Sequence, residues 1–158
     1  MGIELRTGTF PGTLDEKGRV SIPARLREWY SGELIIARGG YHPCAQVMIP
    51  RVWEQYSQKL MNSEAVDEDD YDLIQHLYIH SAQVVEIDKL GRIPVPPDTR
   101  KWANLTKDCL VISAENHLEI WDYEGYYGYL NENRARAQEA VKKMGVVRLF
   151  KMKGRDGD

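Results

Sequence analysis

One stretch occurs twice in this chain: Asp15-Glu16-Lys17-Gly18-Arg19-Val20-Ser21-Ile22-Pro23 returns 73 positions later as Asp88-Lys89-Leu90-Gly91-Arg92-Ile93-Pro94-Val95-Pro96. Across residues 15–29 and 88–102 the identical positions hold an aspartate, a glycine, two arginines, a proline and a tryptophan, with Val/Ile exchanges between them. The likeness continues into the apolar runs 34–36 and 110–112. A repeat of this kind predicts two copies of one small structural unit.

Length and composition are those of a globular protein, but each half is too small to form a stable core easily by itself. The chain has 158 residues, 42% of them hydrophobic and 28% charged, which is ordinary for a soluble globular fold. Each half holds only about 70 residues, a size at which a single core is marginal. We therefore expect the halves to pack on each other or on other subunits, and we expect a homo-oligomer.

Cysteine usage and charge narrow the class of protein further. Cys44 and Cys109 are far apart, and no secretory signal stands ahead of them, which predicts free thiols and a cytoplasmic location. No apolar run reaches the roughly 20 residues that a membrane span needs, so no membrane partner is expected. The net charge of -3 argues against a protein that coats polyanions. A surface that binds nucleic acid must therefore be confined to a small basic region of the protein.

The pattern of apolar residues and turn formers predicts the same order of elements in both halves. Strands are expected at 7–14, 19–22, 33–38 and 45–49, and again at 82–87, 92–95, 109–113 and 117–121. Helices are expected at 24–30, 50–61, 67–80, 96–103 and 122–143, several of them opened by proline. The turn after residue 14 predicts a hairpin between the first two strands. The basic tail, with Arg148, Lys151, Lys153 and Arg155, is expected to fray.

The repeated turn has a purely structural interpretation. Asp15 and Asp88 can accept hydrogen bonds from backbone N–H groups two or more residues on, and Gly18 and Gly91 allow a positive φ. The arginine that follows each glycine can fold back on its aspartate as a surface ion pair. Such turns occur without any binding function.

The functional interpretation is that the turn presents Arg19, helped by Lys17, at the edge of a two-stranded ribbon. A ribbon of that width can enter a DNA major groove. Arginine can grip guanine O6 and N7, or a phosphate, with two parallel hydrogen bonds. An assembly that presents several ribbons would read repeated sequence elements, because each contact raises the effective concentration for the next.

Other constellations support neither a metal site nor catalysis. His42, Cys44, His76, His80 and Cys109 have no paired ligand spacing, so we expect no metal and no cofactor. The His-Pro-Cys run at 42–44 places a thiol near an imidazole, but no residue supplies an oxyanion hole. We do not expect an enzyme. The four tryptophans, Trp29, Trp53, Trp102 and Trp121, recur at matched points of the repeat, which favours packing roles.

Several motifs, taken in order, resemble those of the MraZ family. They are Thr13-Leu14-Asp15-Glu16-Lys17-Gly18-Arg19-Val20-Ser21-Ile22-Pro23, then His42-Pro43-Cys44, then the turn 88–92, then Leu118-Glu119-Ile120-Trp121-Asp122. The resemblance covers about residues 8–140. It implies an α+β fold of two tandem SpoVT/AbrB-like swapped-hairpin β-barrel units with short helices. It also implies ring-shaped homo-oligomers that bind double-stranded DNA at short direct repeats, upstream of the bacterial division and cell-wall gene cluster. Such proteins usually act as repressors, in the cytoplasm and on the nucleoid.

On that resemblance the chain divides into a first SpoVT/AbrB-like domain at 8–61, an acidic helical linker at 62–80 and a second domain at 81–127. A C-terminal helix and basic tail follow at 128–158. The linker departs from similar proteins, because it carries Glu68, Asp69, Asp70 and Asp72 where those tend to have arginines.

The expected DNA contacts combine the arginine positions that the resemblance implies, Arg19 and Arg92, with the other basic residues around the first turn. They are Lys17, Arg19, Arg25, Arg27 and Arg92, with the turns stabilised by Asp15, Gly18, Asp88 and Gly91. In the second half Leu90, Pro94 and Asp98 replace Lys17, Ser21 and Arg25. We therefore expect a compact basic patch beside the first turn, with Arg19 as the base reader. Arg92 serves either the phosphate backbone or its own turn. The rival interpretation is a protein-binding module in which both turns are structural.

Overall fold

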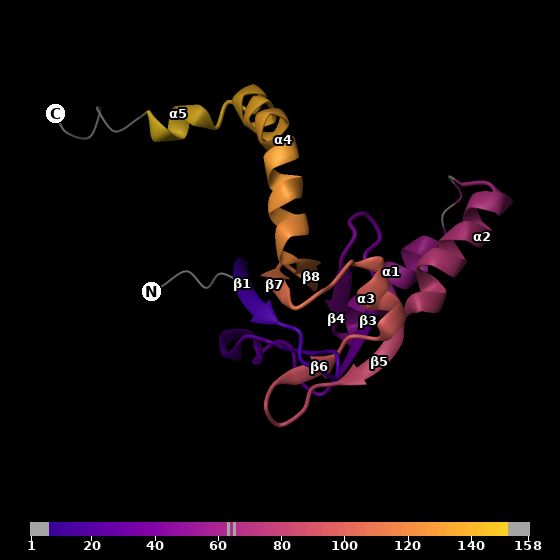
Figure 1. Cartoon of the computed structure of the whole chain (residues 1–158). Coiled ribbons are helices and arrows are strands. Elements are labelled where there is room, and N and C mark those ends of the chain that lie inside the picture. Colours follow the sequence, from indigo (N-terminus) through magenta and orange to yellow (C-terminus); the bar gives the residue numbers. More distant parts are fainter. Residues whose placement is uncertain (1–6, 63, 65, 152–158) are drawn as a thin grey trace. The chain divides into compact units, whose positions relative to one another are not determined.

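The computed structural model describes residues 7–62, 64 and 66–151, and within them two compact units. The first unit ends at Tyr123 and the second begins at Glu124. All eight described strands belong to the first unit (Figure 1). The predicted fraying of the tail concerns mainly residues 152–158, including Lys153 and Arg155, which lie outside the described residues.

The strands of the first unit form two antiparallel sheets. The larger sheet has the order β1-β7-β8-β4-β3-β5 and the smaller one pairs β2 with β6. The strands span Gly8–Thr13 (β1), Arg19–Ser21 (β2), Glu33–Arg38 (β3), Ala45–Met48 (β4), Gln83–Glu86 (β5), Arg92–Pro94 (β6), Asp108–Ser113 (β7) and Leu118–Asp122 (β8). This mixed architecture of helices with antiparallel sheets agrees with the predicted α+β class.

Strands from the two repeats pair with each other. β1 pairs with β7, β2 with β6, β4 with β8 and β3 with β5, all antiparallel. The segments 8–61 and 81–127 therefore contribute to the same sheets. The predicted hairpin between residues 7–14 and 19–22 is wrong, because β1 forms its ladder with β7. The turn itself is present, since the N–H of Asp15 donates to the carbonyl of Arg19 at 2.9 Å.

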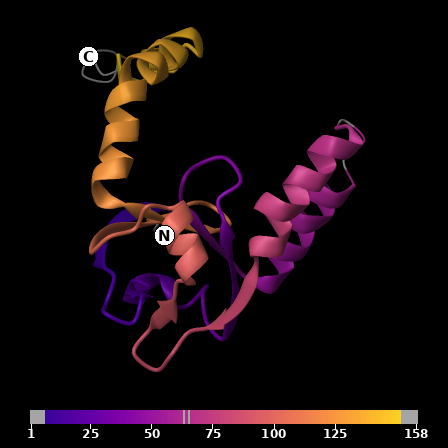
Figure 2. The same ribbon diagram turned by 45° about the vertical axis from the view of Figure 1, so that its right-hand side comes forward.

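Short helices connect these strands. They are the single 3-10 turns Ala24–Leu26 (η1) and Ile79–Ser81 (η2) and the α-helices Pro50–Met61 (α1), Glu68–Leu77 (α2) and Pro97–Trp102 (α3). Asp67 caps α2 by accepting from the N–H of Asp70 at 2.8 Å, and the acidic first turn suits the positive end of the helix dipole. α1 and α2 lie side by side as a helical hairpin (Figure 2).

Two predicted helices are shorter than expected. The helix predicted at 24–30 is one 3-10 turn followed by irregular turns, in which Trp29 and Tyr30 both donate to the carbonyl of Leu26. The helix predicted at 67–80 ends at Leu77. Beyond Leu77 the chain leaves the α-helix, and the hydroxyl of Ser81 donates to the carbonyl of Tyr78 at 2.7 Å, a local hydrogen bond that competes with the helical pattern.

The core of the first unit is a single cluster drawn from both repeats. Its largest fully buried members are Ile22, Leu26, Leu34, Ile36, Ile93, Leu118 and Ile120, joined by Val20, Val47 and Val111. Burying each of these apolar side chains stabilises the folded state by about 1.5–3 kcal/mol, which makes this cluster the main source of stability in the unit. Because each repeat contributes about half of these side chains, neither repeat has a complete core alone.

The second unit contains α5 (Val147–Phe150) and α4 (Tyr123–Lys143), apart from the first residue of α4, which belongs to the first unit. The helix predicted at 122–143 is thereby confirmed, although Gly125 and Gly128 lie within it. Gly145, with φ of +73°, ends the helix and leads into α5, which the sequence pattern did not predict. Of the helices that the structure describes, none is both long and apolar enough to span a membrane.

Candidate nucleic-acid interface

The first turn is built around the carboxylate of Asp15. Its Oδ1 accepts hydrogen bonds from the backbone N–H groups of Lys17 and Arg19, each at 2.9 Å. Its Oδ2 accepts from Nε of Arg19, also at 2.9 Å. One carboxylate thus fixes both the turn and the side chain that leaves it.

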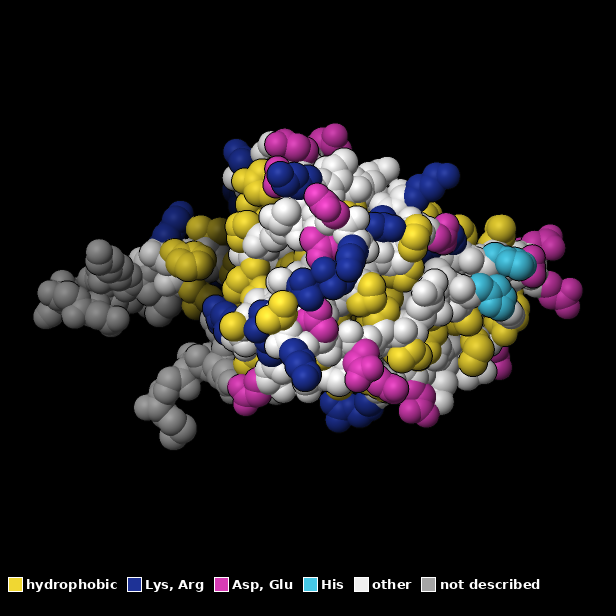
Figure 3. All heavy atoms as spheres, turned by 60° about the horizontal axis from the view of Figure 1, so that its bottom comes forward, with side chains coloured by type: hydrophobic (Ala, Val, Ile, Leu, Met, Phe, Trp, Pro, Cys, Tyr) yellow, Lys and Arg dark blue, Asp and Glu magenta, His cyan; other side chains and the backbone are white. Residues whose placement is uncertain are grey.

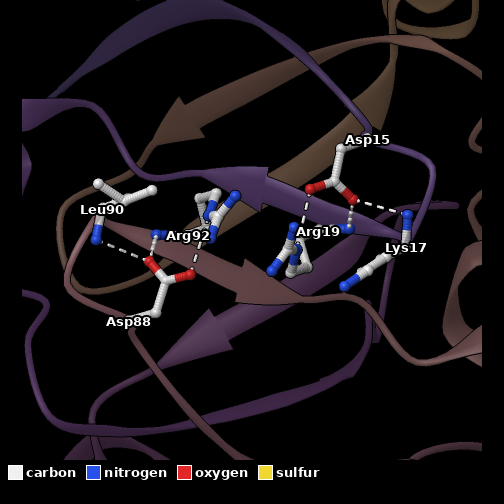
Figure 4. Close-up of polar contacts among 6 residues, drawn as sticks. All are labelled: Asp15, Lys17, Arg19, Asp88, Leu90 and Arg92. Carbon is white, nitrogen blue, oxygen red and sulfur yellow. Dashed lines mark hydrogen bonds and ion pairs between the residues drawn. The ribbon is translucent and has the colours of Figure 1, made fainter.

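The second turn has the same geometry. Oδ1 of Asp88 accepts from the N–H groups of Leu90 and Arg92, each at 2.9 Å. Its Oδ2 accepts from Nε of Arg92 at 2.8 Å (Figure 4). The two copies differ in the side chains around this frame, since Leu90 stands where the first turn has Lys17.

These contacts keep both carboxyl groups ionised. The pKa of Asp15 is lowered, first by the backbone hydrogen bond from Arg19 and then by the hydrogen bond from its side chain, although desolvation opposes them. The pKa of Asp88 is lowered for the same reasons by Arg92. The pairs are partly exposed, so they add little to stability, and their main effect is to orient each guanidinium.

The two turns meet in the β2–β6 ribbon. Its register pairs Arg19 with Pro94, Val20 with Ile93 and Ser21 with Arg92. The central pair, Val20 and Ile93, is buried in the core. Side chains alternate between the faces of a strand, so Arg19 and Arg92 lie together on the opposite face. As diagonal neighbours across two strands they are about 7–8 Å apart at the backbone.

Backbone hydrogen bonds couple each turn to the other repeat. The N–H of Ile22 donates to the carbonyl of Gly91, and the N–H of Val95 donates to the carbonyl of Gly18, both at 2.8 Å. Gly18 and Gly91 have φ of +77° and +80°, a conformation that disfavours any side chain. Each repeat therefore holds the turn of the other.

An arginine from one repeat also covers the glycine of the other. A β-carbon added to Gly91 would overlap the guanidinium of Arg27, and one added to Gly18 would overlap that of Arg100. Arg27 is oriented by donating from Nε to the carbonyl of Ile22 at 2.8 Å. The ribbon is thus flanked by one additional arginine at each turn.

The predicted basic patch is divided by this exchange. Lys17 and Arg19 lie at the first turn, but Arg27 lies against the second, so the expectation of a compact patch in the first half is wrong. Arg25 is placed with its guanidinium 5.5 Å from the ring centroid of Phe10. Arg27 lies at the second turn because β2 pairs with β6 in antiparallel fashion. The end of β2, and the segment that follows it, therefore lie next to the turn that precedes β6.

Sequence reasoning missed Arg100 as a member of this surface. The signal was present, because Arg100 lies 73 positions after Arg27 in the register of the repeat. Lys89 in the second turn is also exposed. Figure 3 shows Lys and Arg side chains running across the middle of one face, with acidic side chains interspersed. The positive surface is a stripe rather than a broad field.

The histidines and cysteines provide no comparable site in the described ranges. No group of three or more His, Cys, Asp or Glu side chains there could hold a metal ion. Burial raises the pKa of the Cys44 thiol, and it raises that of Cys109 to about 11, so both remain protonated at neutral pH. The ring of His42 lies against Trp121 at 5.3 Å between centroids.

Comparison with known proteins points to one family. A family model described as "MraZ protein, putative antitoxin-like" matches the chain twice, at residues 5–75 and 79–147. A Treponema denticola protein named transcriptional regulator MraZ is 34% identical over 142 residues, covering 89% of this chain and 98% of that protein. Proteins of the same name from Treponema pallidum and Saccharopolyspora erythraea are 34% and 35% identical and cover 82% and 85% of this chain, or 87% and 94% of their own lengths.

Proposed function

Because the chain belongs to the MraZ family, we propose that it is a DNA-binding transcriptional regulator that reads DNA with the outer face of the β2–β6 ribbon. Several relatives carry the name transcriptional regulator MraZ. In this chain the β2–β6 ribbon would be the surface that contacts DNA. No catalytic role is proposed.

The observation that carries the proposal is the pair of arginines held by aspartates on an exposed two-stranded ribbon. In each, Nε is bound to the carboxylate four residues earlier. The terminal nitrogens of Arg19 and Arg92 donate no hydrogen bond to any residue within 7–62, 64 and 66–151. Those terminal nitrogens form the fork that matches guanine O6 and N7 or a phosphate.

The side chains around the ribbon suit the phosphate backbone. Lys17, Arg27, Lys89 and Arg100 belong to the two turns or lie against their glycines, and Arg25 comes from the segment that follows β2. Phosphate contacts position a protein on the duplex, whereas contacts to base edges select the sequence. We assign base reading to Arg19 and either base or phosphate contact to Arg92.

The finer proposals derive from the family resemblance. They are an AbrB-like swapped-hairpin arrangement, assembly of identical chains into a ring, and repression through short direct repeats upstream of the division and cell-wall gene cluster, in the cytoplasm and on the nucleoid. A single small ribbon binds weakly. Several ribbons in one assembly gain affinity on repeated elements through effective concentration.

A protein-binding module is the second candidate. The observation in its favour is that both arginines are already paired within their own turns, as purely structural turns would be. On that interpretation the acidic helix α2, with its exposed Leu73, would be the working surface.

A selection from random duplexes separates the two candidates. Wild-type protein would be incubated with random-sequence double-stranded DNA, and the bound fraction would be sequenced beside that of the double variant Arg19→Ala/Arg92→Ala. We expect the wild type to enrich a repeated element that contains guanine and the variant to enrich none. Equal enrichment by both proteins, or none by the wild type, would refute the proposal.

A further inference from the structure

The second unit ends in an apolar surface with no covering partner among the residues described for that unit. Val141, Met144, Leu149 and Phe150 are exposed, the last two by 68% and 80%. A groove of about 490 Å³ lies beside them, lined by Ala137, Gln138, Val141, Lys142 and Val147. Clusters of exposed apolar side chains on a folded segment mark binding surfaces more often than inert ones.

This surface is also strongly basic. Residues 140–151 contain Lys142, Lys143, Arg148 and Lys151 and no acidic residue. We call the α4–α5 end, residues 137–151, the basic arm; it contains one acidic residue, Glu139. Its occupant should combine negative charge with apolar side chains, because the arm itself combines positive charge with apolar ones.

The first unit carries a surface of that description. Residues 64–72 contain six acidic residues and no basic one. Leu73 on α2 is 56% exposed and follows Asp69 and Asp70 by four and three positions, which places it on their helix face. Met61 is exposed at the end of α1. We call the surface formed by α2 and the end of α1 (Figures 1 and 2) the acidic hairpin; its acidic residues lie in α2 and just before it.

We propose that the basic arm of one copy of this chain binds the acidic hairpin of a second copy. The inference rests on the assembly that the proposed function calls for, and it names the two surfaces that make it. Leu149 and Phe150 of the basic arm make apolar contacts with the acidic hairpin, and Leu73 is one of the side chains that they contact. Lys142, Lys143 and Arg148 face the carboxylates of α2.

Charge also decides the symmetry of this contact. Two basic arms facing each other, or two acidic hairpins, would bring like charges together and be unfavourable. The favoured contact is therefore between different surfaces, head to tail. Two copies can use all four surfaces when each gives its arm to the other's hairpin; otherwise the contacts continue head to tail from one copy to the next. A two-fold dimer through either surface alone is excluded by the same repulsion.

The test uses reciprocal charge reversal in the full-length chain. One variant is Lys142→Glu/Lys143→Glu in the basic arm, and the other is Asp69→Lys/Asp70→Lys in the acidic hairpin. The control is Arg134→Glu/Arg136→Glu, which makes the same charge change on α4 outside the basic arm. Oligomeric mass is measured by native mass spectrometry and by light scattering at micromolar concentration.

We expect an assembled wild type and an assembled control, and at least a tenfold weaker self-association for each reversal variant. Mixing the two reversal variants should restore the assembly, because alternating copies then present opposite charges at every contact. A monomeric wild type, reversal variants of wild-type mass, or a mixture that stays dissociated would each overturn the inference. The last result is the one expected if the arm binds its own chain.

A separate DNA-binding measurement tests the proposed function independently of the assembly. Binding of a selected duplex is measured by fluorescence anisotropy for the wild type and for Arg19→Ala, a substitution outside both proposed contact surfaces. An assembled protein that does not bind DNA refutes the regulatory function and leaves the contact standing. Reversal variants that stay assembled refute the contact, whatever the DNA result.

Discussion

Arg19 and Arg92 lie diagonally across the two strands of the β2–β6 ribbon, each held through Nε by the aspartate four residues before it. They come from different repeats, so the pair exists because β2 and β6 are partners.

Arg19→Ala should weaken binding to a selected duplex by about 1–3 kcal/mol, because two hydrogen bonds to a base edge are lost. Arg19→Lys should recover little of this loss, since an ammonium cannot donate in the same fork. Binding is measured by anisotropy titration, and circular dichroism checks that the fold is intact. Arg134→Ala, on α4, is the control. Wild-type affinity in Arg19→Ala would remove Arg19 from the interface.

Lys17→Ala and Arg27→Ala should each weaken binding to all duplexes alike. Phosphate contacts release counterions, so each lost contact should lower the slope of log K against log salt concentration by about 1. Titrations between low and moderate salt, on a selected and a scrambled duplex, measure this slope. An unchanged slope together with altered sequence preference would instead identify a base contact.

Asp15→Asn should destabilise the protein slightly, by an amount that depends on pH. The folded state lowers the pKa of Asp15 from its usual value of 3.8, so the ionised carboxylate stabilises the fold above that pH. As the pH falls through the lowered pKa, the carboxylate is protonated and the contribution is lost. Urea unfolding should therefore separate wild type and variant at pH 7, with the gap narrowing below about pH 4. A gap that is constant with pH would assign the effect to geometry alone.

Gly18→Ala should cost about 1–2 kcal/mol from its positive φ, and more because the added methyl group displaces Arg100. Gly32→Ala is the matched control, since Gly32 has φ of +67° and no heavy atom near the added carbon. Thermal unfolding compares the two. The difference between them measures the packing of the arginine on the turn, and equal costs would show that the packing contributes nothing.

Ile93→Ala should destabilise the first unit by about 2–5 kcal/mol, because the removed methyl groups leave a cavity in the core. Ile93 is fully buried opposite Val20. Leu90→Ala, three residues earlier and largely exposed, should change stability by less than about 0.5 kcal/mol. Chemical denaturation measures both. Similar values for the two variants would contradict the placement of β6 on the core.

The sequence predicted the elements better than their partners. Strands and turns follow from local signals such as Asp15, Gly18 and the alternation around Val20, and these were placed within a few residues. Pairing depends on residues far apart in the chain. The turn after Leu14 has hairpin chemistry, yet Phe10 is paired with Val111, so local signals favoured the wrong partner.

The candidate site shows the same limit. The carboxylate frame of each turn was predictable, because aspartate, glycine and arginine stand at fixed spacing. The position of Arg27 over Gly91 was not, because it depends on the exchange between repeats. Arg100 could have been found, since the repeat register already aligned it with Arg27.

The hydrogen bonds from Ile22 to Gly91 and from Val95 to Gly18 also set an order of events during synthesis. Contacts between distant segments form late in folding, because the intervening loop must close first. A nascent chain that has left the ribosome as far as residue 80 holds Arg19 but lacks β6. The surface beneath Arg19 is completed only after β6 has been synthesised, so we expect chains truncated within the first repeat to lack the paired ribbon.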